Sequence, residues 1–169
     1  MLHELRVAFN ALDLALYRRV RSLAHTPQIV LWVRRYSQLG EHGAVWLGLG
    51  LAGAAVDRSR RPRWLRATGT VGAAYLISTS IKVAIGRSRP VVDDLPHLMV
   101  TPTGLSFPSS HSSSSFAAAR AYGKLLPAGP LYLAASAMAF SRLYLGVHYP
   151  SDIAAGAALG SVLGTLGRR

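Results

Sequence analysis

The 169-residue chain has no cysteine. Neither a disulfide framework nor a thiolate metal site is therefore possible. Acidic residues are also scarce, with seven Asp and Glu against 19 Lys and Arg, and the only lysines are Lys82 and Lys124. So few carboxylates leave little material for a metal site built from several acids. The length is typical of a single domain.

The balance of charge and hydropathy narrows the class of protein. The formal net charge is +12, half of the residues are hydrophobic and only 15% are charged. A basic excess of this size is typical of proteins that bind nucleic acid or an anionic membrane surface. Nucleic-acid binding usually needs a solvated basic face, whereas these arginines lie in short blocks beside apolar runs. The composition therefore predicts a membrane protein that contacts membrane lipids and no nucleic acid.

The N-terminal part of the chain has the pattern of a helix lying on a membrane. Apolar residues recur at helical spacing through Leu5–Val20, and arginines follow at the carboxyl end, where cations suit the helix dipole. This pattern predicts an amphipathic interfacial helix and not a membrane span. Pro27 ends it, and a second short segment follows at Gln28–Tyr36. We expect residues 1–40 to form this interfacial segment.

The rest of the chain, residues 41–169, is expected to form one membrane-embedded helical domain. A span needs roughly 20 apolar residues, and small residues are typical of helices that pack closely in lipid. The fold class predicted is an all-α integral membrane bundle of about five spans. The five segments are Glu41–Val56, Ala67–Gly86, His111–Leu126, Leu131–Gly146 and Ser151–Leu166. A basic connector is expected at Asp57–Arg66, and one long, proline-rich connection at Arg87–Ser110.

The first of three polar clusters lies at the end of the second predicted span. Lys82 follows a mostly apolar segment, and an ionisable residue inside a membrane is by default a candidate for a functional site. The alternative is a lysine that snorkels to the interface. Arg87 and Arg89 favour the functional interpretation, because three neighbouring cations repel unless an anion joins them. Gly86 and Pro90 predict that the helix breaks first, which lets Lys82 and Arg89 converge.

The second cluster, Pro108-Ser109-Ser110-His111, lies where a loop enters a helix. Free amides at a helix N-terminus bind phosphate oxygens, and serine hydroxyls add further donors. An ordinary N-cap serine would give the same pattern. His111 follows in the first turn, which makes it a candidate proton donor at an anion site.

The third cluster combines Ser141-Arg142 with His148 and Asp152. Asp152 is one helical turn beyond His148, so its carboxylate can accept from one imidazole nitrogen and leave the other as nucleophile or base. A polar helix boundary without function is the alternative. The three clusters together offer cations, imidazoles, a carboxylate and free amides, a set that suits a phosphate group.

In order and spacing, these motifs resemble the type 2 phosphatidic acid phosphatase superfamily, which shares its site with vanadium haloperoxidases. The family pattern is Lys, six residues, Arg-Pro; then Pro-Ser-Gly-His; then Ser-Arg, five residues, His, three residues, Asp. The chain matches this pattern from Lys82 to Asp152 and departs from it at Ser110, where the family usually has glycine. The backbone amide at this position remains available, so we expect activity to survive.

The resemblance implies a role for each site residue. His148 would attack phosphorus and form a phosphohistidine, Asp152 would hold its imidazole, and His111 would protonate the leaving alcohol. The groups expected to bind the phosphate oxygens are Lys82, Arg89, Arg142, the Ser109 hydroxyl and the Ser110 amide. No metal and no cofactor are expected, because the only other acids near the site in the sequence are Asp93 and Asp94.

The same resemblance implies a lipid-linked phosphate as substrate, in the plasma membrane of a bacterium. We expect a polyprenyl-linked phosphate, with phosphatidylglycerophosphate and undecaprenyl diphosphate as alternatives. Two other classes of function remain possible from the sequence: a catalytically silent protein that binds lipid phosphates, and a basic membrane anchor for other enzymes. Asp93, Asp94 and His97 either select the headgroup or belong to a solvated loop.

Overall fold

The computed structural model describes residues 2–168, and all their side chains except those of residues 2, 3, 5 and 6. The chain is helical, which confirms the predicted all-α class. The α-helices are α1 (Leu2–Arg21), α2 (Pro27–Leu39), α3 (Ala44–Val56), α4 (Arg61–Ile85), α5 (Ser110–Tyr122), α6 (Ala128–Tyr144) and α7 (Pro150–Gly164). Short 3-10 turns lie at η1 (Glu41–Gly43), η2 (Arg58–Arg60) and η3 (Leu166–Arg168).

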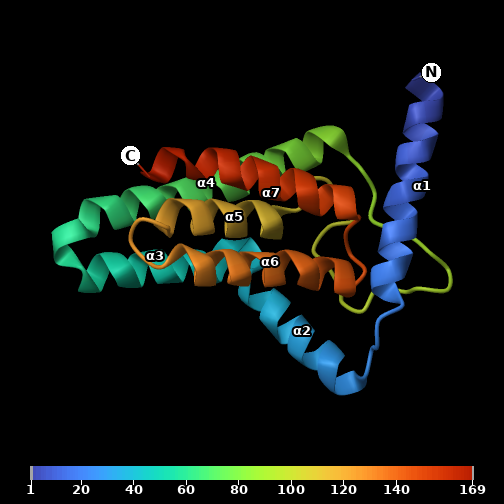
Figure 1. Cartoon of the computed structure of the whole chain (residues 1–169), viewed down its shortest axis with the longest axis horizontal. Coiled ribbons are helices and arrows are strands. Elements are labelled where there is room, and N and C mark those ends of the chain that lie inside the picture. The colour runs from blue at the N-terminus through green and yellow to red at the C-terminus, as the bar shows by residue number, and fades with distance from the viewer. Residues whose placement is uncertain (1, 169) are drawn as a thin grey trace.

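Helices α3 to α7 run along the long axis of the molecule, while α1 stands across one end and α2 slants away from the bundle (Figure 1). The central helix is α5, which packs against α4, α6 and α7. Its side chains are small and buried, including the run Ser112–Ser115 and the alanines Ala117–Ala119. A helix of small residues lets its neighbours approach closely, so the site at its N-terminus is enclosed on several sides.

The closest of these contacts is between α5 and α7. Gly156, Gly160 and Gly164 recur every fourth residue of α7 and face the backbone of α5. A Cβ atom at Gly160 would lie 2.1 Å from the carbonyl oxygen of Ser113, a separation that no side chain tolerates. This glycine seam fixes the position of α7, the helix whose first turn carries Asp152.

The five segments predicted as spans correspond to α3–α7, but most of their boundaries differ by one to six residues. The first segment becomes an α-helix only at Ala44, because His42 and Gly43 have positive φ angles of 52° and 70°. The expected basic connector is largely helical, since α4 begins at Arg61. At the start of this helix, the Asp57 carboxylate accepts a hydrogen bond from Trp64 Nε1 at 3.1 Å. This hydrogen bond is the main reason that the pKa of Asp57 is lowered to about 2.

Within residues 2–168, no helix combines the length and the apolar character that crossing a membrane requires.

The predicted N-terminal helix is confirmed as α1, and its polar side faces the protein. Asp13, Tyr17 and Arg21 recur every fourth residue and are buried, whereas Phe9 and Leu12 are exposed. The Tyr17 hydroxyl donates to the carbonyl of Gly146 at 3.2 Å, and Arg21 donates to the carbonyl of Tyr144 at 2.9 Å. The expected apolar stripe also included Leu5, whose side chain lies outside the described residues. Helix α1 thus docks through polar contacts and leaves its apolar stripe uncovered.

Candidate active site

The long loop between α4 and α5 is closed at its base, and this closure brings the first polar cluster together. Gly86 ends α4 in a left-handed conformation (φ 66°), and its N–H donates to the carbonyl of Lys82 at 3.0 Å. Ser88 then pairs with Leu105 in an isolated antiparallel bridge. The chain turns sharply at this point, so Lys82 and Arg89 line the same cavity, as the break at Gly86 and Pro90 predicted.

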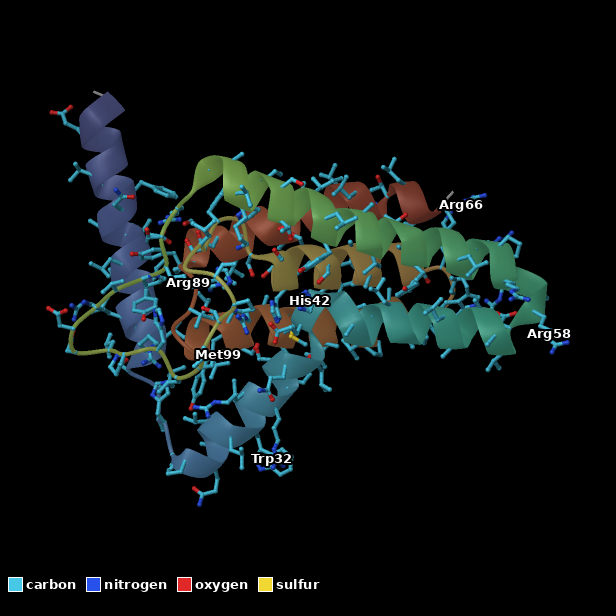
Figure 2. The ribbon with its side chains drawn as sticks, turned by 180° about the vertical axis from the view of Figure 1, so that it is seen from behind. Trp32, His42, Arg58, Arg66, Arg89 and Met99 are labelled. Carbon is cyan, nitrogen blue, oxygen red and sulfur yellow. The ribbon has the colours of Figure 1, made fainter. Side chains whose placement is uncertain are left out.

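This cavity has a volume of about 190 Å³ and is lined by residues of η1, α4, α5, α6 and the loop before α5, and by His148. Figure 2 labels three residues beside it, His42, Arg89 and Met99. Six of the eight expected site residues line the cavity: Lys82, Arg89, Ser110, His111, Arg142 and His148. The other two, Ser109 and Asp152, lie behind its wall.

The three cations of the cavity bind neutral groups. Lys82 Nζ donates to the carbonyls of Ser106 and Pro108 at 3.0 and 2.8 Å, and Arg89 Nε donates to that of Thr103 at 2.9 Å. Arg142 donates to the hydroxyl of Ser37 and to Met99 Sδ, while its Nε is buried without a hydrogen-bond partner. Among the described residues, no carboxylate forms an ion pair with any of these cations. Three buried cations without a salt-bridge partner favour an anion as the ligand of this cavity.

His148 presents an unprotonated nitrogen to these cations. Arg89 Nη1 lies 3.3 Å from His148 Nε2, and a guanidinium can only donate, so Nε2 accepts and the ring proton belongs to Nδ1. Burial holds the pKa of the His148 imidazole well below its ordinary value, and Arg142 and Arg89 lower that pKa further. The imidazole is therefore neutral, with the lone pair of Nε2 available for nucleophilic attack.

The predicted pairing of His148 with Asp152 has a defined geometry. His148 Nδ1 lies 3.5 Å from Asp152 Oδ2 and forms no hydrogen bond within the described part of the chain. Such contacts are often long in the absence of substrate and shorten when it binds. Asp152 Oδ2 accepts from the backbone N–H of Tyr149 at 2.8 Å, which fixes the carboxylate in the first turn of α7.

Arg87 was not among the expected phosphate-binding residues, and it does not line the cavity. Its guanidinium lies behind Asp152 and donates to Asp152 Oδ1 and to Asp13 Oδ2, both at 2.8 Å. The Asp13 carboxylate also accepts from the backbone N–H of Ser151 at 2.9 Å. The anions that Arg87 binds are thus two carboxylates. Asp13 was missed in the sequence, although its position in the polar stripe with Tyr17 and Arg21 was a visible signal.

His111 is held by helix α2 and by the turn that follows it. A carbonyl oxygen only accepts, so His111 Nε2 donates to the carbonyl of Ser37, at 3.2 Å, and Nδ1 is the nitrogen free to exchange a proton. A Cβ atom added to Gly40 would lie 2.9 Å from His111 Cδ2, which shows how closely the turn covers this ring.

The two serines of the second cluster have different surroundings. Ser109 is buried, and its hydroxyl oxygen accepts from the N–H of Ser112 at 3.4 Å as the N-cap of α5. Ser110 lines the cavity, and its hydroxyl accepts from that of Ser78 at 3.2 Å. The fold therefore accommodates a side chain where the family usually has glycine. Ser109 supports the turn, while Ser110 meets the cavity.

The carboxylates near the site also differ from the expectation. Asp93 and Asp94 do not line the cavity, and Asp94 instead pairs with Arg18 on the surface at 3.0 Å. Glu41 does line the cavity, because η1 folds over its mouth. The expectation that Asp93 and Asp94 are the only other acids near the site is therefore wrong. Over the described residues, no three His, Asp or Glu side chains are grouped so that they could hold a metal ion.

A helical bundle that directs three cations and a neutral histidine into one small cavity has the groups needed to bind a phosphate and attack it. The chain belongs to the PAP2 superfamily, whose family model matches residues 63–169.

Known proteins agree with this assignment in sequence and in fold. The chain is 40% identical over 148 residues to the decaprenylphosphoryl-5-phosphoribose phosphatase of Mycobacterium tuberculosis, covering 86% of this chain and 82% of that protein. The arginine- and alanine-rich composition and the loop Val91–Gly104 predict a resemblance to this actinobacterial phosphatase, and the match confirms that prediction.

Two crystal structures share the fold. That of Aquifex aeolicus LpxE has a TM-score of 0.80 at 24% identity, covering 92% of this chain and 94% of that one. That of a transmembrane PAP2 type phosphatidylglycerolphosphate phosphatase from Bacillus subtilis has a TM-score of 0.74 at 26% identity, covering 95% and 84%. The first of these likenesses, at its lower identity, concerns the fold alone.

Proposed function

We propose that this phosphatase hydrolyses a phosphomonoester on a lipid-linked substrate, and that the substrate is decaprenylphosphoryl-5-phosphoribose. The products would be decaprenylphosphoryl-ribose, used in the synthesis of cell-wall arabinan precursors, and inorganic phosphate. The observation that carries the chemistry is the neutral His148, whose Nε2 accepts from Arg89 in a cavity that Lys82 and Arg142 also line. The similarity to the mycobacterial phosphatase supports the choice of lipid.

We further propose that the bundle is embedded in the plasma membrane, with α3–α7 as its five spans and residues 1–40 in the interface. The support is the apolar surface that the fold leaves uncovered. Leu76, Val83, Leu133 and Val162 of the bundle are between 64% and 73% exposed, and α1 turns its apolar stripe outward. Exposed apolar residues on this scale are typical of a surface that contacts lipid. Residues 41–169 then form the phosphatase domain.

In the first step, His148 Nε2 attacks phosphorus in line with the ester oxygen. A phosphorus–nitrogen bond forms, the phosphorus–oxygen bond breaks, and the leaving oxygen takes its electron pair and a proton from His111 Nδ1. His111 must be protonated to act in this way. The phosphate dianion of the substrate favours this protonated form, so substrate binding itself prepares the acid.

In the second step, water attacks the phosphohistidine while His111 accepts a proton from that water. The phosphorus–nitrogen bond breaks, phosphate leaves, and His148 returns to its neutral form. Throughout both steps, Lys82, Arg89 and Arg142 stabilise the charge on the three equatorial oxygens. The hydroxyl and amide of Ser110 at the start of α5 add donors on the same side.

The experiment that tests the proposal is phosphate release from a panel of purified lipid phosphates. Decaprenylphosphoryl-5-phosphoribose should have a higher kcat/KM than phosphatidylglycerophosphate or undecaprenyl diphosphate. A protein that only binds lipid phosphates would retain them without releasing phosphate. A preference for another lipid of the panel would replace the proposed substrate and leave the mechanism standing.

Activity should persist in excess chelator and fall with micromolar vanadate. The chemistry proposed for His148 uses only protein groups, and vanadate adopts the trigonal-bipyramidal geometry of the phosphoryl group during its transfer. Phosphate release in detergent, measured with chelator and with increasing vanadate, checks both expectations. Loss of activity on chelation, restored by added magnesium, would contradict the mechanism.

Asp13→Asn should lower kcat by about tenfold and change KM little, because Arg87 would then bind Asp152 alone and pull it from His148. Removal of a negative charge also favours the neutral imidazole, so the acidic limb of the kcat/KM profile should move to lower pH. Asp13→Glu should restore part of the activity.

The matched control is Asp94→Asn, which removes an exposed carboxylate paired with the same helix through Arg18. It should change neither kcat nor the pH profile. A loss in Asp13→Asn that follows only the fraction of folded protein, with the pH profile unmoved, would reduce Asp13 to a structural residue.

A further inference from the structure

The turn between α2 and α3 places two polar side chains at the cavity that the mechanism does not use. Glu41 and His42 of η1 both line it. His42 has a φ of 52°, a left-handed conformation that is uncommon for residues other than glycine, although histidine and asparagine adopt it more readily than most. Such outliers persist where the surrounding structure imposes them, and they concentrate at functional sites. The conformation of His42 therefore calls for a role at this cavity.

The position of the turn identifies which part of the substrate it meets. A Cβ atom at Gly40 would contact His111, and one at Gly43 would lie 3.3 Å from Cβ of Ser114 in the second turn of α5. His111 is the residue that delivers a proton to the leaving oxygen. The atoms directly beyond that oxygen must therefore pass Glu41 and His42 on their way out.

The polar groups at this mouth are arranged for hydroxyl groups. His42 Nδ1 lies 2.7 Å from the hydroxyl of Tyr75, and the two rings meet edge to face with centroids 5.6 Å apart. Thr79, one turn further along α4, lines the same wall. The mouth thus combines a carboxylate that accepts, hydroxyls that accept or donate, and an imidazole whose second nitrogen remains for a ligand.

We propose that Glu41, His42 and Tyr75 form a subsite for the hydroxyl groups of the phosphate-bearing moiety, and that the enzyme selects a polyol such as a pentose ring. This inference rests on the proposed function. A carboxylate accepts well from two neighbouring hydroxyls, whereas it repels the second phosphate of a diphosphate. A plain alkyl chain would leave these polar groups unpaired, and sites built to bind hydroxyls reject analogues that lack them.

A larger groove of about 760 Å³ lies beyond Met99 and offers a different location for the same moiety. It is lined by Arg34, Gln38 and the loop around Leu98, and by no carboxylate among the described residues. The Arg34 guanidinium already donates to the carbonyl of Leu98. The groove also lacks contact with His111, so the subsite belongs to the Glu41 side.

The test compares two lipids of equal chain length, a short prenyl phosphoryl-5-phosphoribose and the corresponding prenyl monophosphate, which has no sugar. The ratio of their kcat/KM values measures recognition of the hydroxyls. Glu41→Gln, His42→Asn and Tyr75→Phe should each lower this ratio about tenfold. Asparagine tolerates the left-handed conformation, so His42→Asn removes the imidazole without disturbing the turn. Asp93→Asn, an exposed carboxylate outside the cavity, should leave the ratio unchanged.

An unchanged ratio in Glu41→Gln would overturn the subsite. A ratio that falls only in Arg34→Gln would also overturn it, because Arg34 lines the larger groove. A wild-type enzyme that hydrolyses both lipids equally would also overturn it, while the phosphatase assignment would stand. If neither lipid released phosphate, the proposed function would fail. The subsite would then be tested by measuring the affinity of both lipids for the wild type and for Glu41→Gln. Equal affinities of the wild type for the two lipids would reject the subsite.

Discussion

His148→Ala should abolish phosphate release from every substrate, with a loss of at least about 10⁴-fold in kcat, because it removes the atom that forms the covalent bond in the proposed mechanism. The lone pair of Nε2 faces Lys82, Arg89 and Arg142, and alanine leaves the cations without a nucleophile. The loss should not depend on the leaving group, since the attacking atom itself is missing.

Rapid acid-free quenching with a substrate labelled at phosphorus provides the decisive measurement. The wild type should accumulate a labelled phosphoenzyme that is stable to base and labile to acid, as expected of a phosphohistidine. His148→Ala should show none, although it should still bind vanadate through its three cations. Turnover by His148→Ala within tenfold of the wild type would contradict the mechanism, and so would a phosphoenzyme in that variant.

His111→Ala should lose activity in proportion to how much the leaving group needs a proton. An alkyl alcohol is a poor leaving group without protonation, so we expect a loss of roughly 10²- to 10⁴-fold on a lipid phosphate. The p-nitrophenolate ion is stable enough to leave unprotonated, so p-nitrophenyl phosphate should lose less than about tenfold. The contrast follows from the contact with Ser37, which occupies Nε2 and leaves Nδ1 for the leaving oxygen.

Both substrates are measured for wild type, His111→Ala and His148→Ala, with the fraction of folded protein determined for each. His97→Ala is the matched control, because His97 belongs to the loop and does not line the catalytic cavity. Equal losses of His111→Ala on the two substrates would count against an acid role and would favour a role in binding.

Much of the site could be predicted because its residues are adjacent in sequence to the features that orient them. Gly86 ends α4 one turn after Lys82, so the convergence of Lys82 with Arg89 followed from local chain geometry. His148 and Asp152 are related by one helical turn, and the structure keeps their side chains 3.5 Å apart. Such contacts depend only on the backbone of a few consecutive residues, so they can be predicted from the sequence.

The residues that could not be predicted depend on contacts between distant segments. Asp13 reaches Arg87 only because the polar side of α1 docks on the bundle, and Glu41 reaches the cavity only because η1 folds over His111. Arg87 and Arg89 look equivalent in the sequence, being two residues apart in a short basic run. The fold separates them, because Arg87 donates to Asp152 and Asp13 whereas Arg89 lines the cavity.

The close packing of α7 on α5 at the glycine seam has a consequence for the reaction rate. At Gly160 the two backbones leave no room for even a methyl group, so a larger residue there must displace the whole helix. The first turn of α7 contains Asp152, and His148 lies two residues before the helix begins, so both side chains move with α7. A misplacement of about 1 Å at a reacting atom can cost about a hundredfold in rate. Variation in the middle of α7, remote from any substrate, would therefore appear in an assay as a slow enzyme that remains folded.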